Sequence, residues 1–112
     1  MDISFQIDIE PRDKEILLSI LSQYLPQTTI WAYGSRVTGK AQPWSDLDLV
    51  VFSDPEKRSR ISLLKEALEE SNLSFRVDLL EWESLPDSFK LDISSSPTAI
   101  IKLNSVNSFQ VL

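Results

Sequence analysis

Apolar residues recur at intervals of three and four between residues 12 and 25, where the sequence reads RDKEILLSILSQYL. This spacing predicts an amphipathic helix with one apolar stripe facing a core. Pro11 suits the first turn of such a helix, and Pro26 ends it. The stripe consists of Ile16, Leu17, Ile20, Leu21, Tyr24 and Leu25.

Three further segments have the composition of β-strands: TTIWAY (28–33), DLDLVVF (46–52) and FRVDLLEW (75–82). Side chains alternate between the two faces of a strand. Both faces of the second segment are largely apolar, so we expect it to be buried on both sides. Its two faces carry Asp46, Asp48, Val50 and Phe52, and Leu47, Leu49 and Val51; in the third segment Arg76, Asp78, Leu80 and Trp82 share a face.

A second helix is expected between the last two of these strands. Residues 53–56 read SDPE, which has the form of a capping box, and Asn72 is a candidate left-handed stop after a helix that ends near residue 71. Its apolar stripe consists of Ile61, Leu64 and Leu68. A short helix is expected to start near Pro86 and to end before residues 94–96, and the tail from residue 97 is expected to be part strand and part disordered.

The order helix, strand, turn, strand, helix, strand, helix predicts an α/β (α+β) fold with a small sheet of three to four strands flanked by helices. The link between the first two strands has only about 13 residues, so it suits an antiparallel return with a one- or two-turn helix inside it, and the sheet should be mixed. At 112 residues the chain corresponds to one domain, residues 1–112.

Composition narrows the possible chemistry. The chain has no cysteine and no histidine, which excludes disulfides, thiolate metal sites, the commonest general base and the usual zinc ligand. A metal site must therefore be lined by oxygen, which favours Mg²⁺, Mn²⁺ or Ca²⁺. The net charge of −6 argues against broad nucleic-acid binding. No apolar run is long enough to span a membrane, and the acidic start MDISFQIDIE does not resemble a signal peptide, so we expect a cytoplasmic protein.

Three aspartates stand in these apolar strands. Asp46 and Asp48 share one strand face, and Asp78 converges on them if the two strands are neighbours. Two unit charges about 4 Å apart repel by about 4 kcal/mol at an effective dielectric constant of about 20. A fold retains such a cluster when protons or a divalent cation neutralise it, and Mg²⁺ suits that role. The alternative is that Asp46 is a turn residue and that the other two are exposed on edge strands.

Gly34 and Ser35 follow the first strand and open a possible short helix. A helix N-terminus offers free backbone N–H groups to phosphate, and glycine allows a close approach. Gly39 and Lys40 add a flexible point and a cation. The segment is not a Walker A loop, because Ala41 stands where that motif needs serine or threonine after the lysine. Taken alone, Gly-Ser is also an ordinary connection between a strand and a turn.

The combination of Gly34-Ser35, ten residues, Asp46-x-Asp48 and a later Asp78 resembles the nucleotidyltransferase superfamily that includes DNA polymerase beta. The resemblance rests on WAYGSRVTGKAQPWSDLDLVV and FRVDLLEW, and it covers residues 12–82. The small size is similar to that of the minimal nucleotidyltransferases (MNT proteins), whose genes are commonly paired with genes for HEPN-domain proteins. The resemblance implies a polymerase beta palm-like fold.

The resemblance also implies a role for each motif residue. Gly34 and Ser35 would hold a nucleoside triphosphate, with ATP as the co-substrate. Asp46 and Asp48 would hold two Mg²⁺ ions, for which Mn²⁺ can substitute. Asp78 would help to hold the catalytic metal and take the proton from the attacking hydroxyl group. The cations that would neutralise the triphosphate are Arg36, Lys40 and Arg76, each of which is otherwise a solvated or ion-paired surface residue.

The chain has no room for the additional helical domain of larger nucleotidyltransferases, so part of the site should come from a partner. The resemblance implies an antitoxin that transfers AMP onto a tyrosine of a HEPN-type ribonuclease toxin and forms a complex with it. Three alternatives remain: an antibiotic-type enzyme with a small-molecule acceptor, a non-catalytic nucleotide-binding antitoxin that covers its partner, and a small α/β domain with scattered aspartates. Of the tryptophans, we expect Trp31 in the core, Trp44 either covering the sheet edge or meeting a base or partner, and Trp82 in either setting.

Overall fold

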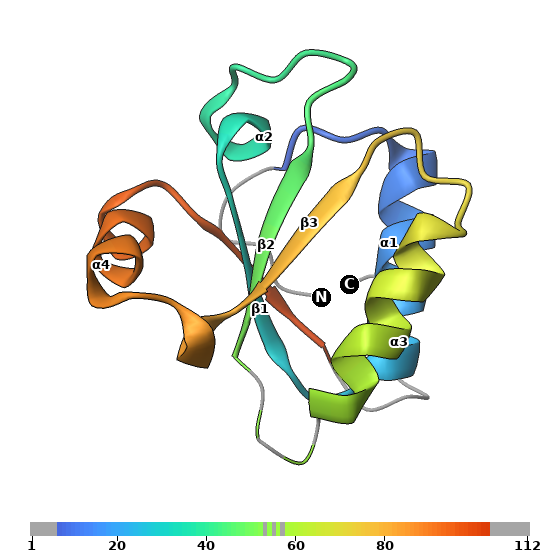
Figure 1. The fold of residues 1–112 in the computed structure, drawn as a ribbon. Coiled ribbons are helices and arrows are strands. Elements are labelled where there is room, and N and C mark those ends of the chain that lie inside the picture. The colour runs from blue at the N-terminus through green and yellow to red at the C-terminus, as the bar shows by residue number, and fades with distance from the viewer. Residues whose placement is uncertain (1–6, 53, 55, 57, 104–112) are drawn as a thin grey trace.

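The computed structural model describes residues 7–52, 54, 56 and 58–103. Helices and strands alternate along the chain, largely in the order that the sequence predicts (Figure 1). The elements are α1 (Pro11–Tyr24), β1 (Thr29–Tyr33), α2 (Ser35–Thr38), β2 (Leu47–Phe52), α3 (Arg58–Glu69), β3 (Val77–Glu81), the 3-10 helix η2 (Trp82–Ser84), α4 (Asp87–Ser95) and β4 (Ala99–Lys102).

The strands form a four-stranded mixed sheet in the order β3-β2-β1-β4. Strand β1 runs antiparallel to both β2 and β4, whereas β2 and β3 are parallel. The short link between β1 and β2 contains the single-turn helix α2 and returns the chain antiparallel, as the length of the link predicts. The β2–β3 connection is long enough for a parallel crossover because it contains α3. The predicted mixed sheet is confirmed.

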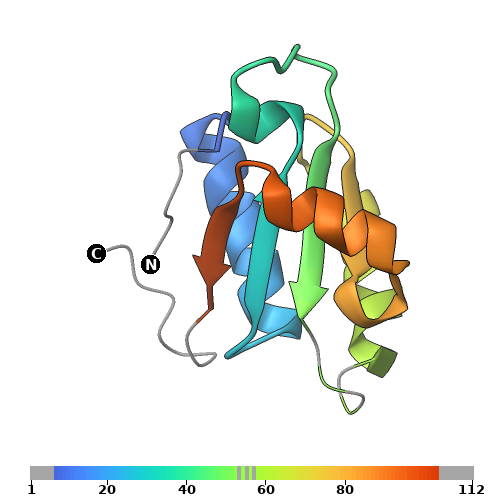
Figure 2. The ribbon, with the colours of Figure 1, turned by 90° about the vertical axis from the view of Figure 1, so that its left-hand side faces the viewer.

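Helices α1 and α3 cover one face of the sheet, and α4 lies across the other, as Figures 1 and 2 show from two sides. The main core lies under α1 and α3, where Leu47, Leu49 and Val51 of β2 are fully buried. Since side chains alternate along a strand, Asp48, Val50 and Phe52 must face α4. The faces of β2 are therefore divided as the sequence predicts, and β2 is the strand that both layers cover.

An aromatic cluster fills the α4 side of the sheet beyond the aspartates. The ring centroids of Trp31 and Phe52 are 4.7 Å apart, those of Phe52 and Trp82 are 4.9 Å apart, and those of Trp31 and Trp82 are 5.7 Å apart. Aromatic pairs at such distances contribute about 0.5–1.5 kcal/mol each beyond the area that they bury. Trp31 and Trp82 are thus packed together but only half-buried, at the end of β2 that is opposite Asp48, so Trp31 does not lie in the core as expected.

Two local predictions are wrong. Asn72 is not a left-handed stop, because Gln27 is the only non-glycine residue with a positive φ (58°) in the part of the chain that the structure describes. The Leu68 carbonyl at the end of α3 instead accepts hydrogen bonds from the Ser71 hydroxyl (2.6 Å) and the Ser71 N–H (3.3 Å), so no left-handed residue is needed there. Trp82 does not end β3 but begins η2.

The remaining boundaries differ by small amounts. Asp46 lies immediately before β2, and α4 continues to Ser95, past the expected end. The tail contributes β4, in agreement with the expected strand, while residues 104–112 lie outside the described residues. The predicted capping box also falls partly outside them, at Ser53 and Pro55. Among the described helices, none combines the length and apolar character that crossing a membrane requires.

Candidate active site

Asp48 and Asp78 lie directly opposite each other on the neighbouring parallel strands β2 and β3. Tyr33, at the end of β1, lies opposite Asp48 on its other side. Neighbouring strands are about 4.8 Å apart, so the three side chains form a row across the sheet on the face that α4 partly covers. The convergence of the two acids is what the sequence predicts. Tyr33 was not expected. The sequence signal that could have identified it is its position directly before Gly34, at the end of a strand predicted to run antiparallel to residues 46–52.

The row carries negative charge that no ion pair in the described part of the chain neutralises. The pKa of the Asp48 carboxyl is raised above its ordinary value by burial first, and then by the charges of Asp78 and Asp46. Burial first, and then the charges of Asp48 and Asp78, raise the pKa of the Tyr33 hydroxyl to about 12. The ion pairs within the described part of the chain involve other residues, Arg12–Asp13 and Arg58–Glu81. The acidic pair is therefore available to a cation from outside the protein.

Asp46 stands at the exposed end of the loop that enters β2, and both of its neighbours are held in place. The Ser45 carbonyl accepts a hydrogen bond from Arg36 Nε at 2.9 Å. The Leu47 N–H donates to the Arg76 carbonyl of the β3 side at 2.9 Å. Asp46 is thus fixed between two anchored residues, while its own side chain stays open to solvent. Its charge reaches Asp48, whose pKa it helps to raise.

Gly34 occupies the one position in the site that no other residue can fill without strain. Its φ of 84° and ψ of −158° lie outside the range that residues with a Cβ adopt easily. A Cβ added there would also collide with Oδ2 of Asp48. The bare glycine therefore lets the Asp48 carboxylate lie against the backbone that leads into α2, whose first residue is Ser35. The first N–H groups of a helix have no partner within it.

Arg36 is placed differently from the expected triphosphate ligand. Its side chain is buried, with only 6% exposed, and its guanidinium lies 4.3 Å from the centre of the Phe75 ring. The guanidinium donates to the carbonyls of Asp8 at 2.8 Å, Ser45 at 2.9 Å and Pro43 at 3.2 Å, with a longer contact to Gln42 at 3.5 Å. This environment favours a role in holding the loop before Asp46 over direct contact with phosphate. The partners Asp8 and Phe75 are distant in the sequence, so local patterns gave no sign of them.

The other candidate residues lie at the rim of the site. Lys40 and Arg76 are exposed, and Lys40 follows α2, where its N–H donates to the Ser35 carbonyl at 3.1 Å. Trp44, in the loop before Asp46, is 76% exposed. The interpretation of Trp44 as a side chain that covers the sheet edge is therefore wrong. Stacking on a base and contact with a partner both remain compatible with its position.

The acidic residues suit a hard divalent cation, although they do not form a closed cage. Within residues 7–52, 54, 56 and 58–103, no three or more His, Cys, Asp and Glu side chains are grouped closely enough to enclose a metal. Mg²⁺ usually takes one or two carboxylates and completes its shell with water and substrate phosphates. The unneutralised pair Asp48–Asp78, with Asp46 beside it, fits that donor set. Chemically, such an arrangement can bind a metal–phosphate complex next to Gly34.

Comparison with known proteins bears on the family and the fold. The family model described as "Nucleotidyltransferase domain" matches residues 14–101, a span that includes α4 and β4 as well as the motif strands. The chain is 45% identical over 86 residues to the "Probable protein adenylyltransferase MntA" of Haemophilus influenzae, covering 76% of this chain and 75% of that protein. It also resembles the fold of one chain in a solved structure described as "Crystal structure of the toxin-antitoxin with AMP-PNP". That likeness has a TM-score of 0.52 at 20% identity and covers 82% of this chain and 73% of the other.

Proposed function

The chain belongs to the nucleotidyltransferase domain family, and we propose that it transfers AMP from ATP onto a hydroxyl group of a partner protein. The observation that carries the proposal is the placement of Asp48 opposite Asp78, with the Asp48 carboxylate against the bare backbone of Gly34. A triphosphate held at Gly34 and Ser35 would lie beside this acidic pair.

The proposed reaction is an in-line displacement at the α-phosphorus of ATP. Asp78 takes the proton from the acceptor hydroxyl, and the acceptor oxygen forms a bond to the α-phosphorus. The bond between the α-phosphorus and the bridging oxygen to the β-phosphorus breaks, and pyrophosphate leaves. The products are the adenylylated protein and pyrophosphate. Positioning the two reactants in this geometry supplies much of the rate enhancement of such a transfer.

A pair of Mg²⁺ ions, for which Mn²⁺ can substitute, is part of the proposal. Asp46, Asp48 and Asp78 would hold them, and bound metal would offset the negative charge that gathers on the attacking and leaving oxygens. The raised pKa of Asp48 supports this assignment, because a carboxyl that neighbouring acids destabilise in its charged form gains most from a cation. Lys40 lies near the end of α2, where its charge would complement that of the triphosphate.

The acceptor is proposed to be a protein, because the Haemophilus influenzae relative is described as a protein adenylyltransferase. The solved structure with a similar fold is described as a toxin-antitoxin, and its description also includes the ATP analogue AMP-PNP. We therefore assign the role of antitoxin to this chain, with a HEPN-domain ribonuclease as toxin and a tyrosine as the acceptor residue. Modification would then inactivate the toxin, and the two proteins would form a complex.

The experiment that tests this function uses the purified chain and the protein that co-purifies with it from its host, which we expect to be a HEPN-domain protein. The intact mass of the HEPN-domain protein is measured before and after incubation with ATP and Mg²⁺. We expect its mass to increase by one or more adenylyl units, and we expect no increase with the Asp46→Asn/Asp48→Asn variant. A stable complex without any mass change would favour a non-catalytic antitoxin that covers its partner.

A further inference from the structure

The order of the strands determines from which side an acceptor can reach the acidic row. In an in-line displacement the attacking and leaving oxygens lie on opposite sides of the phosphorus. Gly34 and Ser35, which would hold the leaving pyrophosphate, follow β1, and Asp78 lies on β3, on the far side of Asp48. An attacking hydroxyl on the side opposite Gly34 and Ser35 would therefore lie near Asp78, toward the outer edge of β3.

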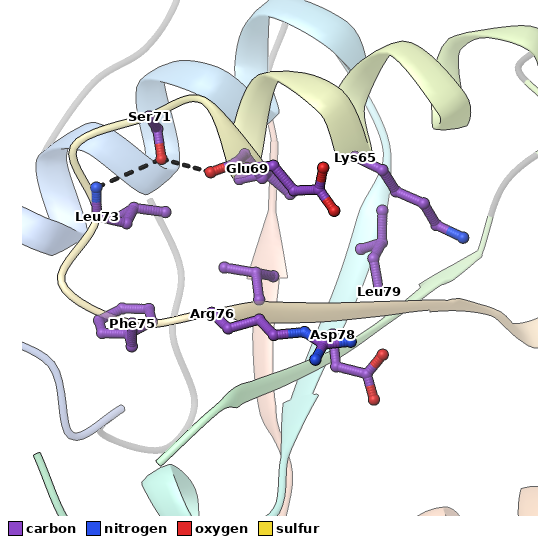
Figure 3. A pocket seen from close by; sticks show the side chains of 10 residues that line it. Lys65, Glu69, Ser71, Leu73, Phe75, Arg76, Asp78 and Leu79 are labelled. Carbon is purple, nitrogen blue, oxygen red and sulfur yellow. Dashed lines mark hydrogen bonds between the residues drawn. The ribbon is translucent and has the colours of Figure 1, made fainter. Parts of the chain in front are cut away.

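A pocket is present at that edge. It has a volume of about 340 Å³ and lies between the end of α3 and β3, on the α3 side of the sheet; Asp78 is part of its wall, but the Asp78 carboxylate extends away from α3. In Figure 3, Arg76 and Asp78 extend from the same side of β3, and Lys65 extends from α3 beside the strand. Pockets for small molecules measure about 300–1,000 Å³. This one is at the lower end of that range, so it suits one side chain with its adjacent backbone better than a second nucleotide.

Strand β3 also presents backbone groups to this pocket. It is the last strand of the sheet in the part of the chain that the structure describes, so one of its edges has no neighbouring strand there. The Arg76 carbonyl points toward β2, where it accepts from Leu47 N–H. Because backbone groups alternate in direction along a strand, those of Asp78 also point toward β2, and those of Val77 and Leu79 point outward. Both of these outward-facing residues line the pocket.

We propose that an extended segment of the protein substrate docks along the outer edge of β3, places its acceptor side chain beside the Asp78 carboxylate on the α4 side of the sheet, and places an adjacent side chain in the pocket on the α3 side. This inference rests on the proposed function. The segment would pair with the outward N–H and C=O groups of Val77 and Leu79, as an added strand does on an exposed sheet edge. Arg76 and Lys65 are exposed cations on either side of the pocket and would contact carbonyl or carboxylate groups of the segment. Such docking brings the hydroxyl to Asp78 from the side that in-line attack requires.

Amide hydrogen exchange tests the docking independently of catalysis. The chain, labelled with ¹⁵N, is studied by NMR with and without the HEPN-domain protein and without ATP. We expect exchange of the Val77 and Leu79 amides to slow by about tenfold or more in the complex. The amides of Asp78 and Leu80, which already face β2, serve as internal controls and should change much less. Unchanged exchange at Val77 and Leu79 in a saturated complex would overturn the proposal.

A matched pair of variants at Val77 tests the backbone contact in turnover. Val77→Pro removes an N–H that points away from β2, a position at which an edge strand tolerates proline, while Val77→Ala trims the side chain and keeps the N–H. Relative to Val77→Ala, we expect Val77→Pro to raise the KM for the HEPN-domain protein by about tenfold and to leave the KM for ATP within about twofold. Equal KM values for the protein substrate in the two variants would argue against strand addition.

The two proposals fail in distinguishable ways. If the wild-type chain transfers AMP but neither the exchange rates nor the KM ratio change as expected, the docking site is wrong and the proposed function stands. If the wild-type chain transfers no AMP to the HEPN-domain protein, both proposals are wrong. If Val77→Pro does not fold, the exchange measurement on the wild-type chain still decides.

Discussion

Asp48 on β2 and Asp78 on β3 are direct neighbours in a parallel register, and after burial the charge of Asp78 is the largest cause of the raised pKa of Asp48. The raised pKa of Asp48 has a consequence for the metal-free protein. Since its folded pKa lies above the ordinary value of 3.8, the folded state binds more protons than the unfolded state between these two values. Stability therefore falls as the pH rises through this window.

The first prediction is that Asp48→Asn stabilises the metal-free protein at neutral pH. The variant removes the charge that burial, Asp78 and Asp46 oppose. In the presence of a chelator, the melting temperature of Asp48→Asn minus that of the wild type should increase between about pH 4 and about pH 7. Asp92→Asn, at an exposed position of α4, is the matched control. A difference for Asp48→Asn that does not change with pH would contradict this account of the row.

The second prediction compares the two glycines with positive φ. Gly34→Ala should abolish transfer and metal–ATP binding, because its Cβ would collide with the Asp48 carboxylate as well as strain the backbone. Gly39 has a φ of 82°, but a Cβ there would meet no atom within 4 Å. Gly39→Ala should therefore cost only about 1 kcal/mol in folding free energy and leave ATP binding nearly unchanged. Calorimetric titration with ATP and Mg²⁺ distinguishes the two variants. An equal loss of ATP binding in Gly34→Ala and Gly39→Ala would argue against a functional role for the close approach of the Asp48 carboxylate to Gly34.

The third prediction concerns Arg36 as a positioning residue. Arg36→Met keeps an aliphatic stem near Phe75 but removes the donors to the carbonyls of Asp8, Pro43 and Ser45. We expect a loss of about 3 kcal/mol in folding free energy, because partly buried hydrogen bonds to a charged donor are lost. We also expect weaker Mn²⁺ binding, measured by electron paramagnetic resonance, because Asp46 is no longer held in place.

Two controls separate these effects. Arg12→Met removes an exposed arginine whose contacts are a hydrogen bond to the Asn72 carbonyl and an ion pair with Asp13. It should cost less than about 1 kcal/mol and leave Mn²⁺ binding unchanged. Leu25→Ala destabilises the core at the end of α1, near the Thr29–Phe52 end of the sheet and away from Asp46, so it should lower stability by about 2–5 kcal/mol without a change in Mn²⁺ affinity. If Leu25→Ala and Arg36→Met weaken Mn²⁺ binding equally, Arg36 has no specific positioning role.

The fourth prediction is that Trp44 contributes to binding and not to folding. Because its side chain is 76% exposed, Trp44→Ala should change the folding free energy by no more than about 0.5 kcal/mol. The same variant should raise the Kd for ATP or for the HEPN-domain protein by about tenfold, since aromatic side chains often carry interface energy. Separate titrations with ATP and with the HEPN-domain protein decide between the two contacts. Unchanged affinity for both would remove Trp44 from the binding surface.

Much of the fold follows from periodicity and length. The stripe of α1 and the alternation along β2 predict the two covered faces, and the short link with one helical turn predicts the antiparallel β1–β2 pair. The end of α3 differs from expectation because a side-chain hydrogen bond, and not a left-handed residue, ends the helix. The Ser71 hydroxyl donates a hydrogen bond to the Leu68 carbonyl, where a left-handed Asn72 was expected to end the helix.

The candidate site is predictable only where its residues share a local pattern. Gly34 and Asp48 belong to one motif, so their proximity could be expected, although the contact that excludes a Cβ could not. Arg36 shows the limit, because its burial depends on the Asp8 carbonyl and the Phe75 ring, which only the tertiary structure brings to it. The edge pocket is likewise invisible in the sequence, since it is formed by α3 and β3 together.

The fate of labelled ATP shows whether the acceptor attacks the α-phosphorus. Parallel reactions with the HEPN-domain protein contain ATP labelled at the α-phosphate or at the γ-phosphate, with Asp78→Asn as the control. We predict that only the α-label becomes bound to the HEPN-domain protein, that the γ-label is released as pyrophosphate, and that Asp78→Asn produces neither result. Transfer of the γ-label to the protein, or no transfer of either label by the wild-type chain, would contradict the account.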